Sequence, residues 1–219
     1  MIAIMHILGL GINYRNGHLN ERLAVLQQAR AERNPQIITK LNGLGVKITL
    51  EQVAKISGRG QMGRPHIARA LMELGAASDL QEAFDKYLGW RKPAYVSKFR
   101  FPPEQALAMI KEAKGIPVLA HPFTLNQGSA YALKNVIIEL KGLGLAGLEV
   151  FYSDHTPEQI ALYLKLAREL NLLITGGSDY HGLNKPEITL GSMPSQDKLT
   201  YNLVEALKAW RRREYPLAD

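Results

Sequence analysis

Four residues of the types that bind divalent cations lie beside short apolar runs of this 219-residue chain. The runs, at 7–12, 118–120 and 172–175, have the composition of buried strands, and a proline or a glycine pair follows the second and third. Side chains at the ends of neighbouring strands meet at one edge of a sheet, where imidazoles and carboxylates together can hold a hard divalent ion. The predicted metal ligands are His6, His121, Asp179 and His181.

Six short segments occur in one order along most of the chain. They are 6–12 (HILGLGI), 63–71 (GRPHIARAL), 94–98 (AYVSK), 118–122 (VLAHP), 147–152 with 155–159 (GLEVFY and HTPEQ), and 177–182 (GSDYHG). In this combination the chain resembles the PHP (polymerase and histidinol phosphatase) domain family, in its branch of stand-alone phosphoesterases of nucleotides and short nucleic acids. The resemblance implies a distorted β/α barrel and phosphoester hydrolysis. It also implies that Asp179 and His181 are catalytic residues as well as metal ligands.

The chain also departs from the family's pattern. The family's HxH motif with its following Asp, and the strand ends that carry a further His, Asp and Glu, have no counterpart here. The resemblance therefore implies an N-terminally truncated form, a partial barrel that lacks its first strands. We expect the chain as written to be inactive or impaired, and an upstream-extended form to hydrolyse phosphoesters. An unpaired sheet edge would favour self-association.

Composition limits the kinds of site and the compartment. The chain has no cysteine, which excludes disulfides, thiolate nucleophiles and cysteine-ligated zinc. Its 46% hydrophobic and 21% charged residues are ordinary for a globular protein. The apolar start of the chain lacks a basic region and is too short to span a bilayer. We therefore expect a cytoplasmic protein that does not bind a membrane.

The positive charge is concentrated in the middle of the chain. Residues 15–100 contain 15 Lys and Arg against 7 Asp and Glu, whereas residues 101–219 contain 12 against 13. A positive field of this kind attracts phosphate-rich ligands. A solvated helical surface is the alternative interpretation.

Hydrophobic spacing and capping residues predict a helical insertion in an α/β fold. Helical spacing extends from 20 to about 44 with an interruption near Pro35, and further helices start near 49, 64 and 79. Residues 2–13 are expected to form the first strand. The remainder alternates between helices and strands: helix 103–114, strand 116–120, helix 129–142, strand 146–152, helix 156–170, strand 172–176 and helix 199–213. We expect a parallel sheet in a partial barrel, 1–14 and 93–219, with the helical insertion 15–92.

Three residues of the basic segment form a predicted phosphate clamp. Arg64 and His66 lie at a predicted helix N-terminus, where exposed amides and a guanidinium can bind an anion, and Lys98 follows the insertion. A solvated basic surface is the alternative.

Glu149 is the polar residue inside the predicted strand 146–152. Parallel strands are buried on both faces, so a charged side chain within one needs a partner. We expect the Glu149 side chain to lie around the predicted metal ligands and to accept a ring N–H of a histidine. A pairing with a nearby lysine or arginine is the alternative.

The resemblance implies divalent ions as cofactors, and manganese, zinc, iron and magnesium all suit histidine and carboxylate ligands. It implies a phosphorylated small molecule, nucleotide or oligonucleotide as the substrate.

Two other functions stay open. The short helices on either side of Gly58–Gly60 resemble a helix-turn-helix, which would make the chain a non-catalytic nucleic-acid-binding protein, although that motif's turn is usually shorter. A degenerate family member would act as a scaffold.

Overall fold

The computed structural model describes residues 5–58, 60–182, 187–191 and 199–216. The chain divides into two compact units. The first unit comprises Met1–Asn20 with Phe101–Asp219, and the second comprises Glu21–Arg100. Each unit has a hydrophobic core of its own. Residues 2–4 of the first predicted strand, and Arg59 of the predicted helix-turn-helix, lie outside the described residues.

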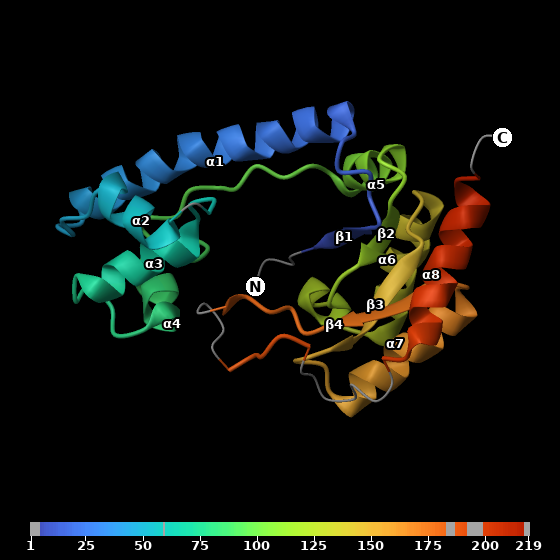
Figure 1. The fold of residues 1–219 in the computed structure, drawn as a ribbon. Helices are drawn as coiled ribbons and strands as arrows, with labels where there is room; N and C mark the ends of the chain where they lie inside the picture. Colours follow the sequence, from blue (N-terminus) through green and yellow to red (C-terminus); the bar gives the residue numbers. More distant parts are fainter. Residues whose placement is uncertain (1–4, 59, 183–186, 192–198, 217–219) are drawn as a thin grey trace. The chain divides into compact units, whose positions relative to one another are not determined.

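A four-stranded sheet organises the first unit, with the strands in the order β1-β2-β3-β4 (Figure 1). The strands are β1 (Ile7–Leu10), β2 (Ile116–Leu119), β3 (Gly147–Tyr152) and β4 (Leu173–Gly177). The predicted α/β class is confirmed, and β2, β3 and β4 are parallel. β1 pairs with β2 in the antiparallel direction, so the prediction of a wholly parallel sheet is wrong for this strand. No direct crossover joins β1 to β2, because the second unit lies between them in sequence, and the crossover rule therefore does not set its direction. The partial barrel stays a prediction.

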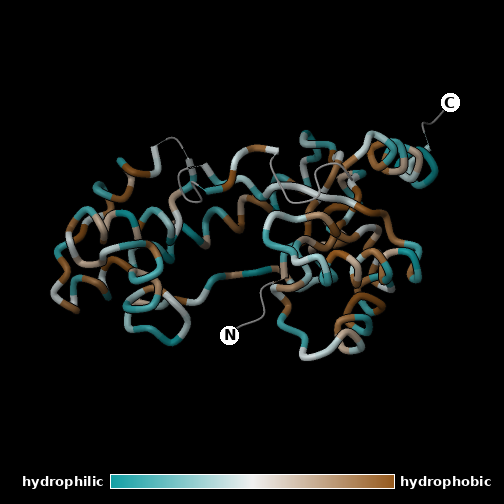
Figure 2. The backbone as a smooth tube through the Cα atoms, turned by 90° about the horizontal axis from the view of Figure 1, so that it is seen from below, coloured by the Kyte–Doolittle hydropathy of each residue, from teal (hydrophilic) through white to brown (hydrophobic). Residues whose placement is uncertain are grey.

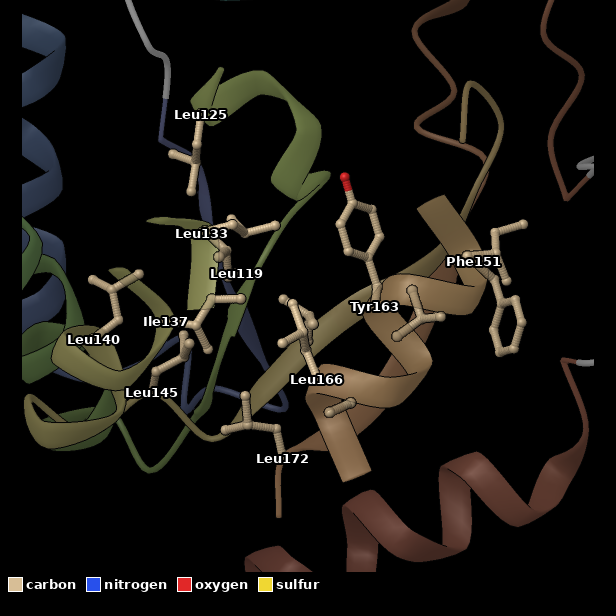
Figure 3. Packing of buried hydrophobic residues seen from close by; sticks show 14 of the residues in the cluster. Leu119, Leu125, Leu133, Ile137, Leu140, Leu145, Phe151, Tyr163, Leu166 and Leu172 are labelled. Atoms are coloured by element: carbon tan, nitrogen blue, oxygen red, sulfur yellow. The ribbon is translucent and has the colours of Figure 1, made fainter. Parts of the chain in front are cut away.

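Helices cover both faces of this sheet. They are α5 (Pro103–Glu112), the 3₁₀ turn η2 (Pro122–Leu125), α6 (Ala130–Gly142), α7 (Pro157–Glu169) and α8 (Tyr201–Glu214). Residues of α6 and α7 pack with Leu119 in the larger core (Figure 3), whereas Trp210 of α8 packs in the cluster that contains Val118. Adjacent residues of β2 thus face opposite layers, as strand geometry requires. Figure 2 shows that hydrophobic and hydrophilic stretches alternate along the chain.

The described part of the second unit is helical. It contains most of α1 (Gly17–Gly43), then α2 (Leu50–Ser57), α3 (Arg64–Glu73), α4 (Leu80–Ala83) and the π-helical turn η1 (Phe84–Leu88). The predicted helix starts near 49 and 79 are confirmed, and the N-cap residues are Thr49 and Asp79. The predicted interruption at Pro35 is wrong, since α1 continues through it. A proline removes one helical hydrogen bond, and the burial of Ile37 and Leu41 just beyond it offsets that loss.

Within the described residues, none of the helices is both long enough and apolar enough to cross a bilayer. The predicted self-association through a sheet edge stays a prediction.

The close approach of β4 to β3 gives a test of the packing. A Cβ atom at Gly176 would lie 2.6 Å from the carbonyl oxygen of Phe151 and 2.7 Å from Cδ2 of Leu199. We expect Gly176→Ala to lower the free energy of unfolding by roughly 1–3 kcal/mol in urea denaturation, because the backbone must shift. The control is Gly177→Ala, whose Cβ would meet only the Glu149 carboxylate, at 3.5 Å. Equal stability of the two variants would contradict this packing.

Candidate functional site

The direction of β1 brings two predicted ligands together. Ile7 pairs with Leu119, and the N–H of Ala120 donates to the carbonyl of His6 at 3.0 Å. The start of β1 therefore lies beside the end of β2, and His6 Nδ1 is 3.1 Å from His121 Nε2. A parallel β1 would place His6 at the opposite edge of the sheet.

The local structure after β2 orients the His121 ring. His121 is 7% exposed and has a φ of 28°, and η2 follows it directly. The Thr124 hydroxyl donates to the His121 carbonyl at 3.0 Å, so its oxygen accepts from the ring at Nδ1, 3.1 Å away. This network assigns the ring proton to Nδ1 and leaves the Nε2 lone pair directed at His6. A histidine that binds a metal needs one ring nitrogen without a proton, and the hydrogen bond from the other nitrogen fixes the orientation of the ring.

Glu149 lies at the same edge, 5% exposed. Its Oε2 accepts the main-chain N–H of His121 at 2.8 Å, rather than the ring N–H that we expected from the sequence. Burial raises the pKa of Glu149 to about 7, against a smaller lowering by the His121 N–H, and the nearby Asp179 carboxylate raises it further. Among the described residues, no lysine or arginine forms a salt bridge with it.

A β-bulge lets two residues of β3 reach this edge. In a regular strand Glu149 and Tyr152, three positions apart, would point to opposite faces. The pairing of β3 with β4 shifts by one residue between Glu149 and Phe151, and the extra residue re-aims the side chains that come after it in the strand. The Tyr152 hydroxyl consequently donates to Oδ2 of Asp179 at 3.1 Å, and its ring centroid lies 5.4 Å from that of His121.

Asp179 and His181 form the second pair of predicted ligands. Asp179 follows β4 with a left-handed φ of 50°. His181 Nδ1 lies 2.7 Å from the main-chain oxygen of Asp179 and 3.5 Å from its Oδ1. The Tyr152 side chain connects this pair to His121. Imidazole and carboxylate are the donor types that a divalent ion needs, so the chemistry of the edge fits one. Within the described residues, no three such side chains are arranged to hold one ion, and the four-ligand set stays a prediction.

Two further histidines have the environments of structural residues. His155, which lies shortly before α7, is 4% exposed and donates from Nδ1 to the Val150 carbonyl at 2.8 Å. Its ring packs against Phe123 and Tyr163, and burial lowers its pKa, which favours the neutral form. His18 is exposed and contacts Glu112 at 2.6 Å, so it lies at the surface.

The second unit contains a group of cations that we call the cationic cluster: Arg30, Arg33, Arg64, Lys98 and Arg100. Burial lowers the pKa of Lys98, and the other four members lower it further. Arg33 is 6% exposed, and burial, then Arg64 and Arg30, lower its pKa. Its Nε is buried and has no hydrogen-bond partner among the described residues. A group of like charges with a buried guanidinium is stabilised by a bound anion.

Two residues of the predicted phosphate clamp also have structural roles. Arg64 donates to the Leu88 carbonyl at 3.1 Å and lies over the rings of Phe84 and Tyr95. His66 accepts from the Gly63 N–H at 3.1 Å and so caps α3, and burial lowers its pKa. The orientation of this clamp toward the strand edge stays a prediction.

Sequence reasoning missed some of the residues that the structure gathers. Arg30 and Arg33 were not singled out, although a spacing of three along a helix places two side chains on one face. Tyr152 was also missed, because only the bulge directs it toward Asp179.

No family model matches the chain. It is 30% identical over 178 residues to a 3′,5′-nucleoside bisphosphate phosphatase of Chromobacterium violaceum, covering 81% of this chain and 62% of that protein. It is 32% identical over 177 residues to the 5′-3′ exoribonuclease Rnm of Escherichia coli, covering 81% and 60%. The chain thus spans less than two thirds of the length of these relatives.

Two solved structures have similar folds. One, from Bifidobacterium adolescentis and described as a metal-dependent phosphoesterase, has a TM-score of 0.78 and 29% identity over 94% of this chain and 71% of that one. The other, an amidohydrolase of C. violaceum with bound sulfate, has a TM-score of 0.74 and 28% identity over 88% and 68%. The chain is therefore similar, over most of its length, to phosphoester-cleaving enzymes.

The raised pKa of Glu149 predicts a pH-dependent stability of the metal-free protein. The folded protein binds this proton more tightly than the unfolded chain, whose pKa is near 4.5. The stabilising effect is complete below the unfolded pKa and is lost as the pH rises through about 7, with a total of about 3 kcal/mol. Urea denaturation with a chelator present, at several pH values, measures it.

Glu149→Gln separates this effect from other titrations. The amide oxygen can still accept the His121 N–H but cannot ionise, so we expect the loss of stability above about pH 5 to be much smaller. Glu139→Gln changes an exposed glutamate of α6 and should keep the wild-type dependence. The assignment fails if Glu149→Gln and the wild type lose stability equally as the pH rises.

Proposed function

We propose that this chain is part of a metal-dependent phosphoesterase of the PHP type, which hydrolyses phosphate esters of nucleotides or the ends of short nucleic acids. The observation that carries the proposal is the pair His6 and His121, with ring nitrogens 3.1 Å apart at a strand edge that also holds two carboxylates. The relatives named as a bisphosphate phosphatase and an exoribonuclease support the substrate class.

His6, His121, Asp179 and His181 are the residues that would hold divalent ions, with manganese, zinc, iron and magnesium all suited to them. Such ions, when bound, supply Lewis-acid stabilisation of charge on the reacting phosphate. The residues around the ligands position them. Glu149 holds the main chain of His121 through its N–H, and Tyr152 holds the Asp179 carboxylate.

The cationic cluster supports a phosphate-bearing substrate. We propose that Arg64, His66 and Lys98 bind a substrate phosphate together with Arg30 and Arg33. The arginines offer fixed guanidinium donors, which suit phosphate oxygens. Repulsion within the cluster lowers the pKa of Lys98, and a bound dianion would offset that repulsion.

The helix-turn-helix alternative gains less support. α2 and α3 pack against one another, but a recognition helix reads bases with side chains of its first turn. Arg64 in that turn of α3 is instead held by the Leu88 carbonyl and two aromatic rings of its own unit.

The activity is tested on the protein encoded by the full reading frame that contains this chain. With manganese we expect hydrolysis of a 3′,5′-nucleoside bisphosphate or of 5′-phosphorylated RNA, and loss of activity with a chelator. Asp179→Ala should lower the amount of bound metal and reduce kcat/KM by more than about 100-fold. Loss of a residue that only hydrogen-bonds to a metal ligand costs about 10- to 100-fold, and loss of the ligand itself should cost at least as much. His18→Ala, at an exposed histidine, should change neither. Full activity of metal-stripped protein would refute the proposal.

The phosphate clamp is tested through Lys98. We expect Lys98→Ala to raise KM by roughly 10- to 100-fold with little change in kcat and metal content, since it removes one charge-assisted contact. Lys86→Ala removes an exposed lysine of the same unit and should behave as wild type. Arg64→Ala should raise KM similarly but also lower stability, because Arg64 holds Leu88. An unchanged KM in Lys98→Ala would remove Lys98 from the clamp.

A further inference from the structure

A cavity lies within the second unit between α1, α2 and the segment that precedes α3. Its volume is about 490 Å³, within the range of small-molecule sites. Alanine, proline, leucine and methionine side chains form much of its wall, and amide and charged side chains complete it. The lining residues used below are Arg30, Ala31, Asn34, Glu51, Ala54 and Gln61. Apolar walls with a few hydrogen-bonding groups suit a flat ring with polar edges, such as a nucleobase.

The cavity is continuous with the cationic cluster. Arg30 belongs to both, and its Nη1 donates to Oε1 of Gln61 in the cavity wall. Asn34 also connects them, because its Oδ1 accepts from Nη2 of Arg33 at 3.3 Å and its side chain lines the cavity. A phosphate on the cluster and a ring in the cavity would therefore be neighbours, as they are within one nucleotide.

Two polar groups near the cavity lack a usual hydrogen-bond partner among the described residues: the Arg33 Nε, and the Ala31 carbonyl in α1. Arg33 is buried at 6% exposure with an unpartnered Nε, and a buried charge is costly unless it is paired. Pro35 has no N–H to donate to the carbonyl of Ala31, four residues earlier in α1, so the helix does not supply the usual donor there. An anion on the cationic cluster would compensate the charge of Arg33, and an amino group of a base in the cavity would be a suitable donor for the Ala31 carbonyl.

We propose that the cavity binds the base of a nucleotide whose phosphate lies on the cationic cluster, so that the second unit recognises one nucleotide of a single-stranded substrate. This inference rests on the proposed function for the class of substrate, and deepens it by naming the part of the substrate that is read. Recognition by a cavity in the second unit does not require bound metal.

Binding is therefore measured with the full chain in the presence of a chelator, by the fluorescence anisotropy of a labelled, 5′-phosphorylated single-stranded RNA. Ala54→Trp places a large side chain in the cavity from an exposed position of α2, and should weaken binding by about tenfold. Ala24→Trp, at an exposed position of α1 outside the cavity, is its matched control and should bind as wild type.

The contribution of charge to RNA binding is tested by removing one positive and one negative side chain from the cavity wall. Arg30→Ala should weaken binding by about tenfold and reduce the slope of log K against log salt by about one. Glu51→Gln removes a carboxylate from the cavity wall and should strengthen binding about twofold. Lys86→Ala removes an exposed cation elsewhere in the unit and should have little effect.

An RNA with abasic sites separates base recognition from phosphate attraction. The wild type should bind it about as weakly as Ala54→Trp binds intact RNA, and Ala54→Trp should cause no further loss. The inference is overturned if the wild type does not bind RNA with a chelator present, or if Ala54→Trp and Arg30→Ala bind as wild type. If the protein hydrolyses its substrate with manganese and these variants do not change the rate, the proposed function holds and the base-recognition inference fails. If binding depends on the cavity but no hydrolysis is found, the base-recognition inference holds and the proposed phosphoesterase activity fails.

Discussion

The antiparallel pairing of β1 with β2 is the interaction on which the candidate site depends. Main-chain hydrogen bonds hold the start of β1 beside the end of β2, and the Ala120 N–H to His6 carbonyl bond continues that pairing to the sheet's edge. Without it the His6 ring would not lie near His121. The parallel strands beside β1 are largely buried, so the predicted ligands come from the strand ends, and Glu149 is the buried carboxylate inside one of these strands. The site is thus a consequence of how the edge strand is docked.

The buried carboxylate of Glu149 is part of the same construction. Its hydrogen bond from the His121 N–H fixes the main chain at a residue with positive φ, where a non-glycine backbone is costly. The bulge in β3 then allows Tyr152, from the same strand, to hold Asp179. One irregular strand therefore supports predicted ligands that come from two other segments of the chain.

The two units present opposite electrostatic needs. At the sheet edge of the first unit, Glu149 is buried without a salt bridge to any described lysine or arginine, and imidazole nitrogens face each other. In the second unit a buried arginine lies among like charges. A cation would stabilise the first arrangement, and an anion would stabilise the second. These two separate requirements, together with relatives named as phosphoester-cleaving enzymes, are the physical basis of the proposed function.

The sequence by itself determined the kind of structure and the positions of its elements. Apolar runs with glycine or proline at their ends located β2, β3 and β4, and capping residues such as Thr49 and Asp79 located helix starts, because these signals act over a few residues. They also indicated which side chains lie at strand ends, including His121 and Asp179. Local signals do not contain the direction of an edge strand, the bulge that re-aims Tyr152, or the continuity of α1 through Pro35. Only the tertiary structure decided these, because each depends on contacts between residues far apart in the chain. The clustering of Arg30 and Arg33 with Lys98 is of the same kind, since burial and the packing of distant segments bring these charges together.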